Sequence, residues 1–231
     1  MACKYAKLKI GKNICEQRIA VYDEIEQLKY KEISKYGNVV LKISNSCWKN
    51  IFINIKDTND IFEHKIKKLK KLLEYEHGLI EAQFFHLYAK KRIIVERQFI
   101  PLSDLYEFKF YVINNEIKFI WLRKYIDRKV RFFFYDENFN MIYEKRNNTY
   151  LNPLNKSFSK KKYILQLLKK YAILLSEDFP NFIRVDLYVF HDKIYLSELT
   201  FASHNGKNTL YKNKKFVKDA VQEFYRRDNY Y

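Results

Sequence analysis

The stretch that decides the fold is IRVDLYVFHDKIYLSELTF, residues 183–201, which sets an aspartate and a glutamate on two strand-like runs joined by a turn. Apolar and polar residues alternate along both runs, and this period of two is typical of a half-buried β-strand. A three-residue loop, residues 191–193, would place Asp186 directly opposite Glu198 in an antiparallel hairpin. A two-residue turn would shift the register and separate the two acids.

Two carboxylates that face each other on a sheet repel unless a positive group lies between them. One interpretation is a divalent cation, which prefers hard oxygen ligands. The other is a solvated strand face on which Arg184, set opposite Thr200 by the same register, neutralises both acids. Hairpin geometry alone favours the second interpretation, so other residues have to decide between them.

Length and composition indicate a folded chain with a sizeable core. The 231 residues are 48% hydrophobic and 18% aromatic, which is far from the composition of disordered proteins. This length suits one large domain or two small lobes that share a cleft. With four glycines and three prolines, the chain contains no low-complexity linker.

The formal charge of +17 would attract nucleic acids, anionic polymers, nucleotides and acidic membranes alike. Lysines are concentrated in HKIKKLKKLLEY and KSFSKKKYILQLLKKY, where they fit the solvated side of helices. The N-terminus lacks the apolar core of a signal peptide, and no later stretch is long enough to span a bilayer. The expected location is therefore the cytoplasm.

The cysteines Cys3, Cys15 and Cys47 are odd in number and lack metal-type spacing. This pattern argues against a disulfide framework or a zinc site, and reduced thiols are expected. No motif links any of the five histidines to a cysteine, so the histidines are interpreted as ordinary surface or packing residues.

In the first half of the chain, residues 1–36 are expected to form a short packing element. NVVLKISNS and NIFINIKD predict a hairpin that carries Lys42 on its first strand. Apolar spacing predicts helices over residues 59–75 and over IEAQFFHLYAKK, followed by a strand, RIIVERQFI, that Pro101 ends.

The second half is rich in strands: EFKFYVI, EIKFIWLRKYI and VRFFFYD. The tripeptide NNE between the first two favours a hairpin, because asparagine tolerates positive φ. A long amphipathic helix is expected to begin at Ser159, and KFVKDAVQEFYRR predicts a terminal helix. The order indicates an α+β fold with mainly antiparallel strands.

Read together, NVVLKISN, RIIVERQFI, YEFKFYVINNEIKFI, the opening hairpin and SHNG resemble the ATP-grasp fold. More narrowly they resemble the teichuronopeptide-biosynthesis (TupA-like) ATP-grasp family of polysaccharide biosynthesis, over roughly residues 3–210. The most specific match is RVDLY followed by ELTF. The resemblance implies two α+β lobes around a nucleotide cleft, with a lid lobe at 37–97, a core lobe with a metal site at 98–231 and a truncated N-terminal lobe.

By this resemblance, Asp186 and Glu198 would hold the magnesium ion that bridges the ATP phosphates. Magnesium uses a few carboxylate oxygens together with phosphate, so the residue types agree. Thr200 stands where many ATP-grasp enzymes have an asparagine ligand, and it is a weaker metal ligand. Arg184 would act in catalysis by lying against the γ-phosphate or an acyl phosphate.

The resemblance also assigns nucleotide contacts. Lys42 matches the lysine that precedes the phosphate-covering loop, although a strand lysine is otherwise usually a sheet-face residue. Glu96 and Phe99 match the hinge that cradles adenine, with simple burial of an edge glutamate as the alternative. Glu107 and Lys109 fall where the family has Asp-Tyr-Lys, which implies ribose or phosphate contacts.

Two further features concern phosphate binding. The arginines Arg123, Arg128 and Arg131 are expected to cluster on the cleft floor, and Arg128 is preferred as a catalytic group because DR before an aromatic run recurs in the family. The phosphate loop reads SNSCWKN and lacks the family's glycines, so Asn45 and Ser46 would donate side-chain hydrogen bonds instead.

The resulting hypothesis is an ATP-dependent carboxylate–amine ligase that works through an acyl phosphate. Its partners would be ATP, Mg²⁺, an anionic saccharide or peptide acceptor and an amine donor. The alternatives are a glycan or small-molecule kinase on the same fold, or a nucleotide- or nucleic-acid-binding protein without turnover. The sequence contains no nucleic-acid motif, which disfavours nucleic acid without excluding it.

Overall fold

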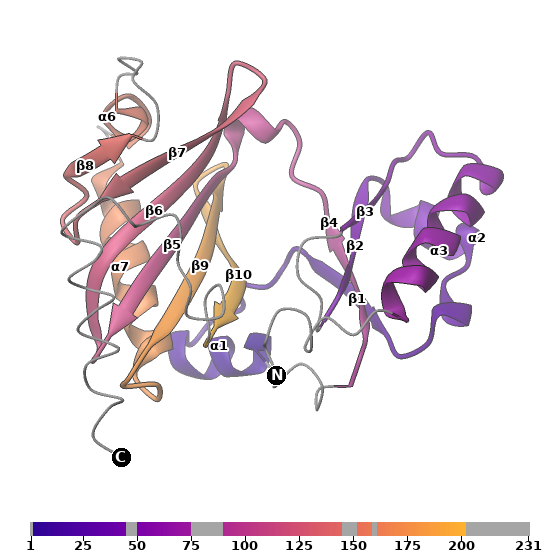
Figure 1. The fold of residues 1–231 in the computed structure, drawn as a ribbon, viewed down its shortest axis with the longest axis horizontal. Coiled ribbons are helices and arrows are strands. Elements are labelled where there is room, and N and C mark those ends of the chain that lie inside the picture. The colour runs from indigo at the N-terminus through magenta and orange to yellow at the C-terminus, as the bar shows by residue number, and fades with distance from the viewer. Residues whose placement is uncertain (1, 45–49, 75–89, 145–151, 159–160, 202–231) are drawn as a thin grey trace. The chain divides into compact units, whose positions relative to one another are not determined.

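The computed structural model describes residues 2–44, 50–74, 90–144, 152–158 and 161–201. The chain divides into two compact units: residues 16–99, and residues 1–15 together with those from 100 onward (Figure 1). Each unit combines an antiparallel sheet with helices, which confirms the predicted α+β class. The helices predicted over IEAQFFHLYAKK and at the C-terminus lie outside the described residues.

The two units group the residues differently from the expected segments 1–36, 37–97 and 98–231. The second unit contains residues 1–15 and resumes at Ile100, and the first unit begins at Glu16. The expected packing element of residues 1–36 is therefore divided between the two units. Its first 15 residues pack with the C-terminal sheet, because α1 (Ala2–Ile10) contacts α7 (Lys162–Ser176) and β10 (Lys193–Thr200).

The unit of residues 16–99 is built on a four-stranded antiparallel sheet in the order β1-β4-β2-β3. The predicted hairpin of β2 and β3 is confirmed. The elements of this unit are β1 (Arg18–Tyr22), β2 (Val39–Ile43), β3 (Ile51–Ile53), β4 (Ile93–Arg97), α2 (Tyr30–Ile33), α3 (Asn59–Leu73) and the 3-10 turns η1 (Ile25–Gln27) and η2 (Ser34–Tyr36).

Helix α3 forms where the apolar spacing predicts it. Thr58 is its N-cap, and the Thr58 hydroxyl accepts a hydrogen bond from the Ile61 N–H at 3.4 Å. Phe62 and Leu69, two turns apart, are fully buried in a cluster with the apolar residues of the sheet. This packing, rather than helix propensity, supplies most of the stability of such a helix.

The second unit is built on a six-stranded antiparallel sheet in the order β10-β9-β5-β6-β7-β8. The turn between β5 and β6 contains Asn114 and Asn115 at φ 52° and 62°, as predicted from NNE. Besides α1, the elements of this unit are η3 (Leu102–Asp104), β5 (Tyr106–Ile113), β6 (Glu116–Ile126), β7 (Lys129–Tyr135), β8 (Met141–Glu144), α6 (Pro153–Phe158), α7 (Lys162–Ser176), β9 (Ile183–Phe190) and β10 (Lys193–Thr200).

Helices α1, α6 and α7 pack on one face of this sheet and enclose its main core (Figure 1). The predicted buried stripe of α7 is present, with Ile164, Leu168 and Leu175 almost fully buried. The helix begins at Lys162 with Lys161 as its N-cap, later than the start expected at Ser159. Ser159 itself lies outside the described residues.

The β9–β10 hairpin corrects two details of the sequence interpretation. Its turn has two residues, His191 and Asp192, both at positive φ (46° and 64°), and not three. A β-bulge between Leu196 and Glu198 adds one residue to β10, which restores the predicted pairing of Asp186 with Glu198. Strand β9, which lies between β10 and β5, is also buried along most of both faces and not half-buried.

The expectation of reduced cysteines is wrong for Cys3 and Cys15, which form a disulfide. Cys3 lies in α1 and Cys15 follows the loop after it, with the two Cα atoms 5.9 Å apart. Their spacing matches no motif, because the proximity is produced by the path of the chain around α1. Cys47 lies outside the described residues.

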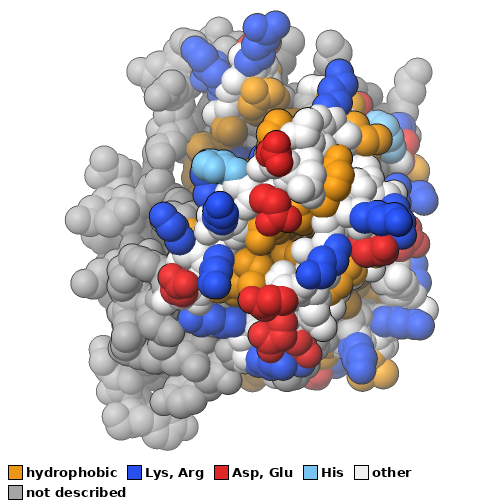
Figure 2. Space-filling model, turned by 90° about the vertical axis from the view of Figure 1, so that its right-hand side faces the viewer, with side chains coloured by type: hydrophobic (Ala, Val, Ile, Leu, Met, Phe, Trp, Pro, Cys, Tyr) orange, Lys and Arg blue, Asp and Glu red, His pale blue; other side chains and the backbone are white. Residues whose placement is uncertain are grey.

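On the face shown in Figure 2, lysine and arginine side chains lie among acidic and apolar ones. The positive charge of the chain is therefore not gathered into a single basic patch on this face, which agrees with the interpretation of the lysine runs as solvated helix faces. Among the described helices, none has both the length and the apolar character needed to cross a membrane.

Lys124 on β6 is a buried cation that the sequence analysis did not single out. Its ammonium group donates to the carbonyl oxygens of Ser103 and Leu105 and lies 3.4 Å from the centre of the Tyr106 ring. Burial lowers the pKa of Lys124 to about 8, while the negative charge of Asp104 acts in the opposite direction.

We expect this lysine to make stability depend on alkaline pH. Between about pH 8 and the ordinary lysine pKa of 10.5, the unfolded chain binds a proton that the folded chain has released. The free energy of unfolding should therefore rise with pH across this window. Urea unfolding of wild type and Lys124→Met at several pH values tests this. Only between about pH 8 and 10.5 should the free energy of unfolding rise more steeply with pH in the wild type than in the variant. Parallel pH dependences of the two proteins would contradict the expectation.

Candidate functional site

A network of charged side chains lies on the face of the six-stranded sheet opposite the helices. Alternate residues of a strand point to the same face, so the polar neighbours of the core residues come together here. Strand pairing aligns the members across four adjacent strands. They are Glu107 and Lys109 from β5, Arg123 from β6, Arg184 and Asp186 from β9, and Glu198 and Thr200 from β10.

Asp186 is the centre of the network and is 0% exposed. Its Oδ1 accepts a hydrogen bond from Arg184 Nε at 2.7 Å, and its Oδ2 accepts from Arg184 Nη2 at 2.9 Å. Lys109 Nζ donates to the same Oδ2 at 2.5 Å. A buried carboxylate requires such partners, because an unpaired charge in the interior is strongly unfavourable.

Arg184 connects Asp186 to the second acid. Its Nη2 lies 3.4 Å from Glu198 Oε2 and donates to Thr200 Oγ1 at 3.0 Å. The Thr200 hydroxyl donates in turn to Glu198 Oε1 at 2.7 Å. The guanidinium group therefore lies between the two opposed carboxylates, as the second interpretation of the sequence expects, although Asp186 is buried and not solvated.

Glu107 continues the network toward β6. It pairs with Lys109 at 2.8 Å and with Arg123 Nη1 at 2.9 Å. Burial alone would raise the pKa of Glu107, but the positive charges of Lys109 and Arg123 outweigh it and lower that pKa to about 2. Glu107 is therefore an anion under all ordinary conditions.

The two buried cations remain charged for the same reason. Burial by itself would lower the pKa of Lys109, but the charges of Asp186 and Glu107 raise it well above its usual range. The pKa of Arg184 is likewise raised, because the charge of Asp186 outweighs burial. With Arg123, these cations balance the three carboxylates of the network.

An aromatic cluster borders the network on the same face of the sheet. In the strand register, Trp121 lies opposite Lys109 and Tyr111 lies opposite Arg184. Both rings are buried and pack with Phe119 and Phe134. Because these rings exclude water, the ion pairs beside them are stronger than those in an exposed site.

The predicted residues Lys42 and Glu96 belong to the unit of residues 16–99 and contact each other. Lys42 Nζ lies 2.6 Å from Glu96 Oε2, and Arg18 Nη2 lies 3.6 Å from Glu96 Oε1. Glu96 is only 3% exposed, so Lys42 and Arg18 provide the positive charge that its buried carboxylate requires. Arg18 gave no signal in the sequence, since only the β1–β4 pairing brings it to Glu96.

The other predicted residues are not members of this network or lie outside the described residues. Arg128 is exposed at positive φ in the turn between β6 and β7, and Arg123, which was not preferred, contacts the network instead. Phe99 is buried after β4. Asn45 and Ser46 lie outside the described residues, so their predicted phosphate contacts remain predictions.

The donor set fits magnesium chemistry, although no group of three or more metal-binding side chains occurs within the described ranges. Asp186 and Glu198 supply two hard carboxylates on paired strands, with the Thr200 hydroxyl next to them. Magnesium needs only one or two carboxylates when a substrate phosphate supplies further oxygens. In this structure the guanidinium group of Arg184 supplies the positive charge between the two carboxylates.

Comparison with known proteins gives a family match over most of the chain. Residues 1–220 match the family model described as TupA-like ATPgrasp. A search of curated proteins finds no match.

Solved structures with a similar fold include two ligases. The D-alanine–D-alanine ligase from Bacillus anthracis complexed with ATP matches 97% of this chain and 63% of its own, with TM-score 0.53 and 12% identity. The ligase PsnB, complexed with a phosphomimetic variant of its minimal precursor, Mg and ADP, matches 96% of this chain and 57% of its own, with TM-score 0.50 and 8% identity. The chain thus spans about three fifths of the length of these proteins, and the likeness shows the fold alone.

Proposed function

The chain belongs to the TupA-like ATP-grasp family, and on this premise we propose that it is an ATP-dependent ligase that joins a carboxylate to an amine. One observation carries the proposal: two opposed carboxylates, Asp186 and Glu198, share a network with Arg184 and Lys109 on one sheet face. Carboxylates for a metal ion and fixed cations for phosphate are the groups that phosphoryl transfer requires.

Each member of the network has a proposed role. Asp186 and Glu198 would hold magnesium, with Thr200 as a weaker ligand. A magnesium ion bound there would neutralise the charge of the phosphates and hold them in place. Arg184 would then turn its guanidinium fork from the acids to the transferred phosphoryl group, and Lys109 would bind a phosphate oxygen.

The proposed reaction has two balanced steps. A carboxylate oxygen of the acceptor attacks the γ-phosphorus of ATP, the bond to ADP breaks, and an acyl phosphate forms. The nitrogen of the amine then attacks the acyl carbon, inorganic phosphate leaves with the bonding electron pair, and the nitrogen loses a proton. Arg184 would stabilise the charge that develops on the phosphoryl oxygens in both steps.

The remaining sequence-based assignments stay part of the proposal. Lys42, Glu96 and Phe99 would contact the nucleotide, as would Glu107. Arg128 would bind phosphate or substrate from its exposed turn. The phosphate loop would contribute Asn45 and Ser46.

The proposed substrates follow from the family alone. We propose an anionic saccharide or peptide acceptor and an amine donor, in surface polysaccharide or glycopeptide biosynthesis in the cytoplasm. A net charge of +17 is compatible with an anionic acceptor.

Glu198 allows a test that separates metal binding from folding. Its side chain is 55% exposed, so Glu198→Gln should change the free energy of unfolding by less than about 0.5 kcal/mol. We expect the variant to lose most of the magnesium dependence of ATP binding in calorimetry. Glu116→Gln, in an exposed pair with Lys118, is the matched control.

Magnesium-dependent ATP binding that is equal in wild type and Glu198→Gln would remove Glu198 from the metal site. ADP release without amide formation, across a panel of carboxylate acceptors and amines, would favour a kinase on the same fold.

A further inference from the structure

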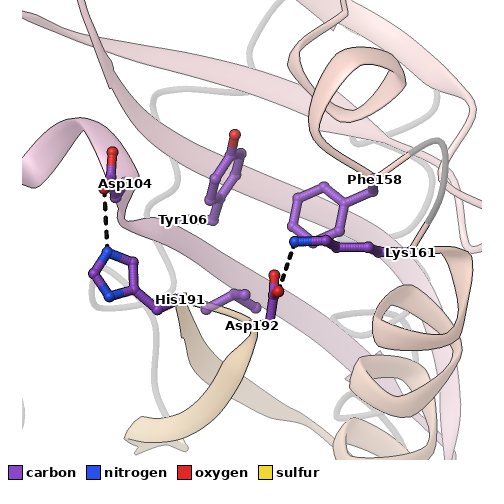
Figure 3. Close-up of a pocket in the computed structure, with 7 residues that line it drawn as sticks. Asp104, Tyr106, Phe158, Lys161, His191 and Asp192 are labelled. Carbon is purple, nitrogen blue, oxygen red and sulfur yellow. Dashed lines mark hydrogen bonds and ion pairs between the residues drawn. The ribbon is translucent and has the colours of Figure 1, made fainter.

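A cavity of about 380 Å³ opens on the helix side of the six-stranded sheet, at the end where the β9–β10 turn lies (Figure 3). This size falls in the lower range of small-molecule sites, roughly 300–1,000 Å³. Its lining comes from η3, β5, α6, the N-cap of α7 and the β9–β10 hairpin. The lining residues are Asp104, Tyr106, Phe158, Lys161, Val189, His191 and Asp192.

The cavity is separate from the network around Asp186. Tyr106 and Val189 are paired in the sheet and belong to the core side, with the residues that α7 covers. Glu107 and Asp186 stand an odd number of residues away on the same strands, so they point to the opposite face. A ligand in the cavity would therefore not occupy the proposed metal and phosphate site.

The rim of the cavity carries a hydrogen bond on one side and an ion pair on the other (Figure 3). His191 Nε2 lies 3.2 Å from Asp104 Oδ2, and Lys161 Nζ lies 2.6 Å from Asp192 Oδ2. All four side chains are between 43% and 64% exposed. Exposed pairs of this kind contribute only about 0–1 kcal/mol each, so a ligand can open them at little cost.

The floor of the cavity is apolar. Phe158 packs edge-on against Tyr106, with ring centroids 5.0 Å apart, and Val189 completes the surface. Phe158 and Val189 are 4% and 2% exposed, so the floor is part of the core and is fixed in place. It offers contact area to an apolar group that enters between the charged rims.

The sign of the rim charges selects the class of ligand. The rim presents the ammonium group of Lys161 and the carboxylates of Asp104 and Asp192, so a ligand with a single charge meets both attraction and repulsion there. A ligand with one ammonium and one carboxylate group can find a partner for both charges and adds no net charge to the site.

We propose that this cavity binds a small zwitterion, an amino acid or a dipeptide with an apolar side chain, at a site distinct from the Asp186 network. The carboxylate of the ligand pairs with Lys161, its ammonium group pairs with Asp104, and its apolar side chain lies on Tyr106 and Phe158. Such a site is independent of the proposed ligase reaction.

The test is a titration of the full chain, followed by NMR, with L-leucine and L-alanyl-L-leucine. Isoamylamine and 4-methylpentanoate serve as analogues with a single charge. We expect the zwitterions to shift the ring signals of His191 and Tyr106 and to bind with a dissociation constant on the order of 1 mM, about −4 kcal/mol. The analogues should bind at least tenfold more weakly.

Variants separate this site from other surfaces. Lys161→Met and Asp104→Asn should each weaken binding of the zwitterions about tenfold or more. Lys162→Met, which changes the neighbouring exposed lysine, and Glu198→Gln, in the Asp186 network, should leave it unchanged. Absence of binding by both zwitterions, equal binding of the analogues, or binding insensitive to Lys161→Met and Asp104→Asn would overturn the proposal.

Discussion

Replacement of Asp186 by asparagine is expected to destabilise the unit that contains the six-stranded sheet by about 3–5 kcal/mol and to abolish magnesium-dependent ATP binding. The neutral amide leaves Arg184 and Lys109, which now donate to Asp186, as buried cations with one partner fewer. It also removes the only carboxylate of the proposed metal pair that is fully buried. Stability and binding should therefore fall together.

Urea unfolding gives the stability of the Asp186→Asn variant, and calorimetry with ATP in the presence and absence of magnesium gives its binding. Asp127→Asn is a matched control, because Asp127 is exposed in a turn at positive φ, where asparagine is equally well tolerated. An Asp186→Asn protein with the stability of wild type would show that the ion pairs of Asp186 do not stabilise the unit with the six-stranded sheet. A stable variant that still binds Mg-ATP would refute the proposed metal site.

Replacement of Arg184 by methionine should lower the free energy of unfolding by a similar amount, but here added magnesium should restore part of the loss. The apolar side chain keeps much of the volume of arginine and removes the charge between Asp186 and Glu198. Asp186 then stays buried without its two hydrogen bonds from Arg184 and faces Glu198 with no guanidinium group between them, so we expect a loss of about 3–5 kcal/mol in metal-free buffer. A magnesium ion can replace the missing cation and restore part of that loss.

The predicted signature is a melting temperature of Arg184→Met that rises with magnesium concentration. At one hundred times the dissociation constant of the ion, linkage would contribute about 2.7 kcal/mol. Wild type should respond much less, because Arg184 already occupies the position between the acids. Arg128→Met, in the exposed β6–β7 turn, controls for loss of an arginine. Equal magnesium responses of wild type and Arg184→Met would show that the guanidinium group does not take the place of a metal ion.

Much of the fold follows from local patterns in the sequence. The asparagines at 114 and 115 indicate their turn because few other residues accept positive φ. The periods of two and 3.6 indicate β9 and α7 because a strand or a helix must present one apolar side to a core. The pairing of Asp186 with Glu198 was also predicted, although from a turn of the wrong length that the bulge in β10 compensates.

The partners of each side chain could not be predicted in the same way. Lys109 reaches Asp186 across 77 residues of sequence, and Arg18 reaches Glu96 only because β1 pairs with β4. The Cys3–Cys15 disulfide and the burial of Lys124 depend on how α1 and η3 pack on the sheet. Such contacts are set by tertiary packing, which leaves no period in the sequence.

The sequence by itself therefore determined the α+β class and those strands and helices that its periods of two and 3.6 predict. Only the tertiary structure decided that a bulge in β10 sets Glu198 opposite Asp186, that Arg184 lies between those acids and that Asp186 is buried. The physical reason is that strand period depends on neighbours in the chain, whereas burial and charge pairing depend on which strands lie side by side. In this sheet β9 lies between β10 and β5, and that order surrounds Asp186 with cations.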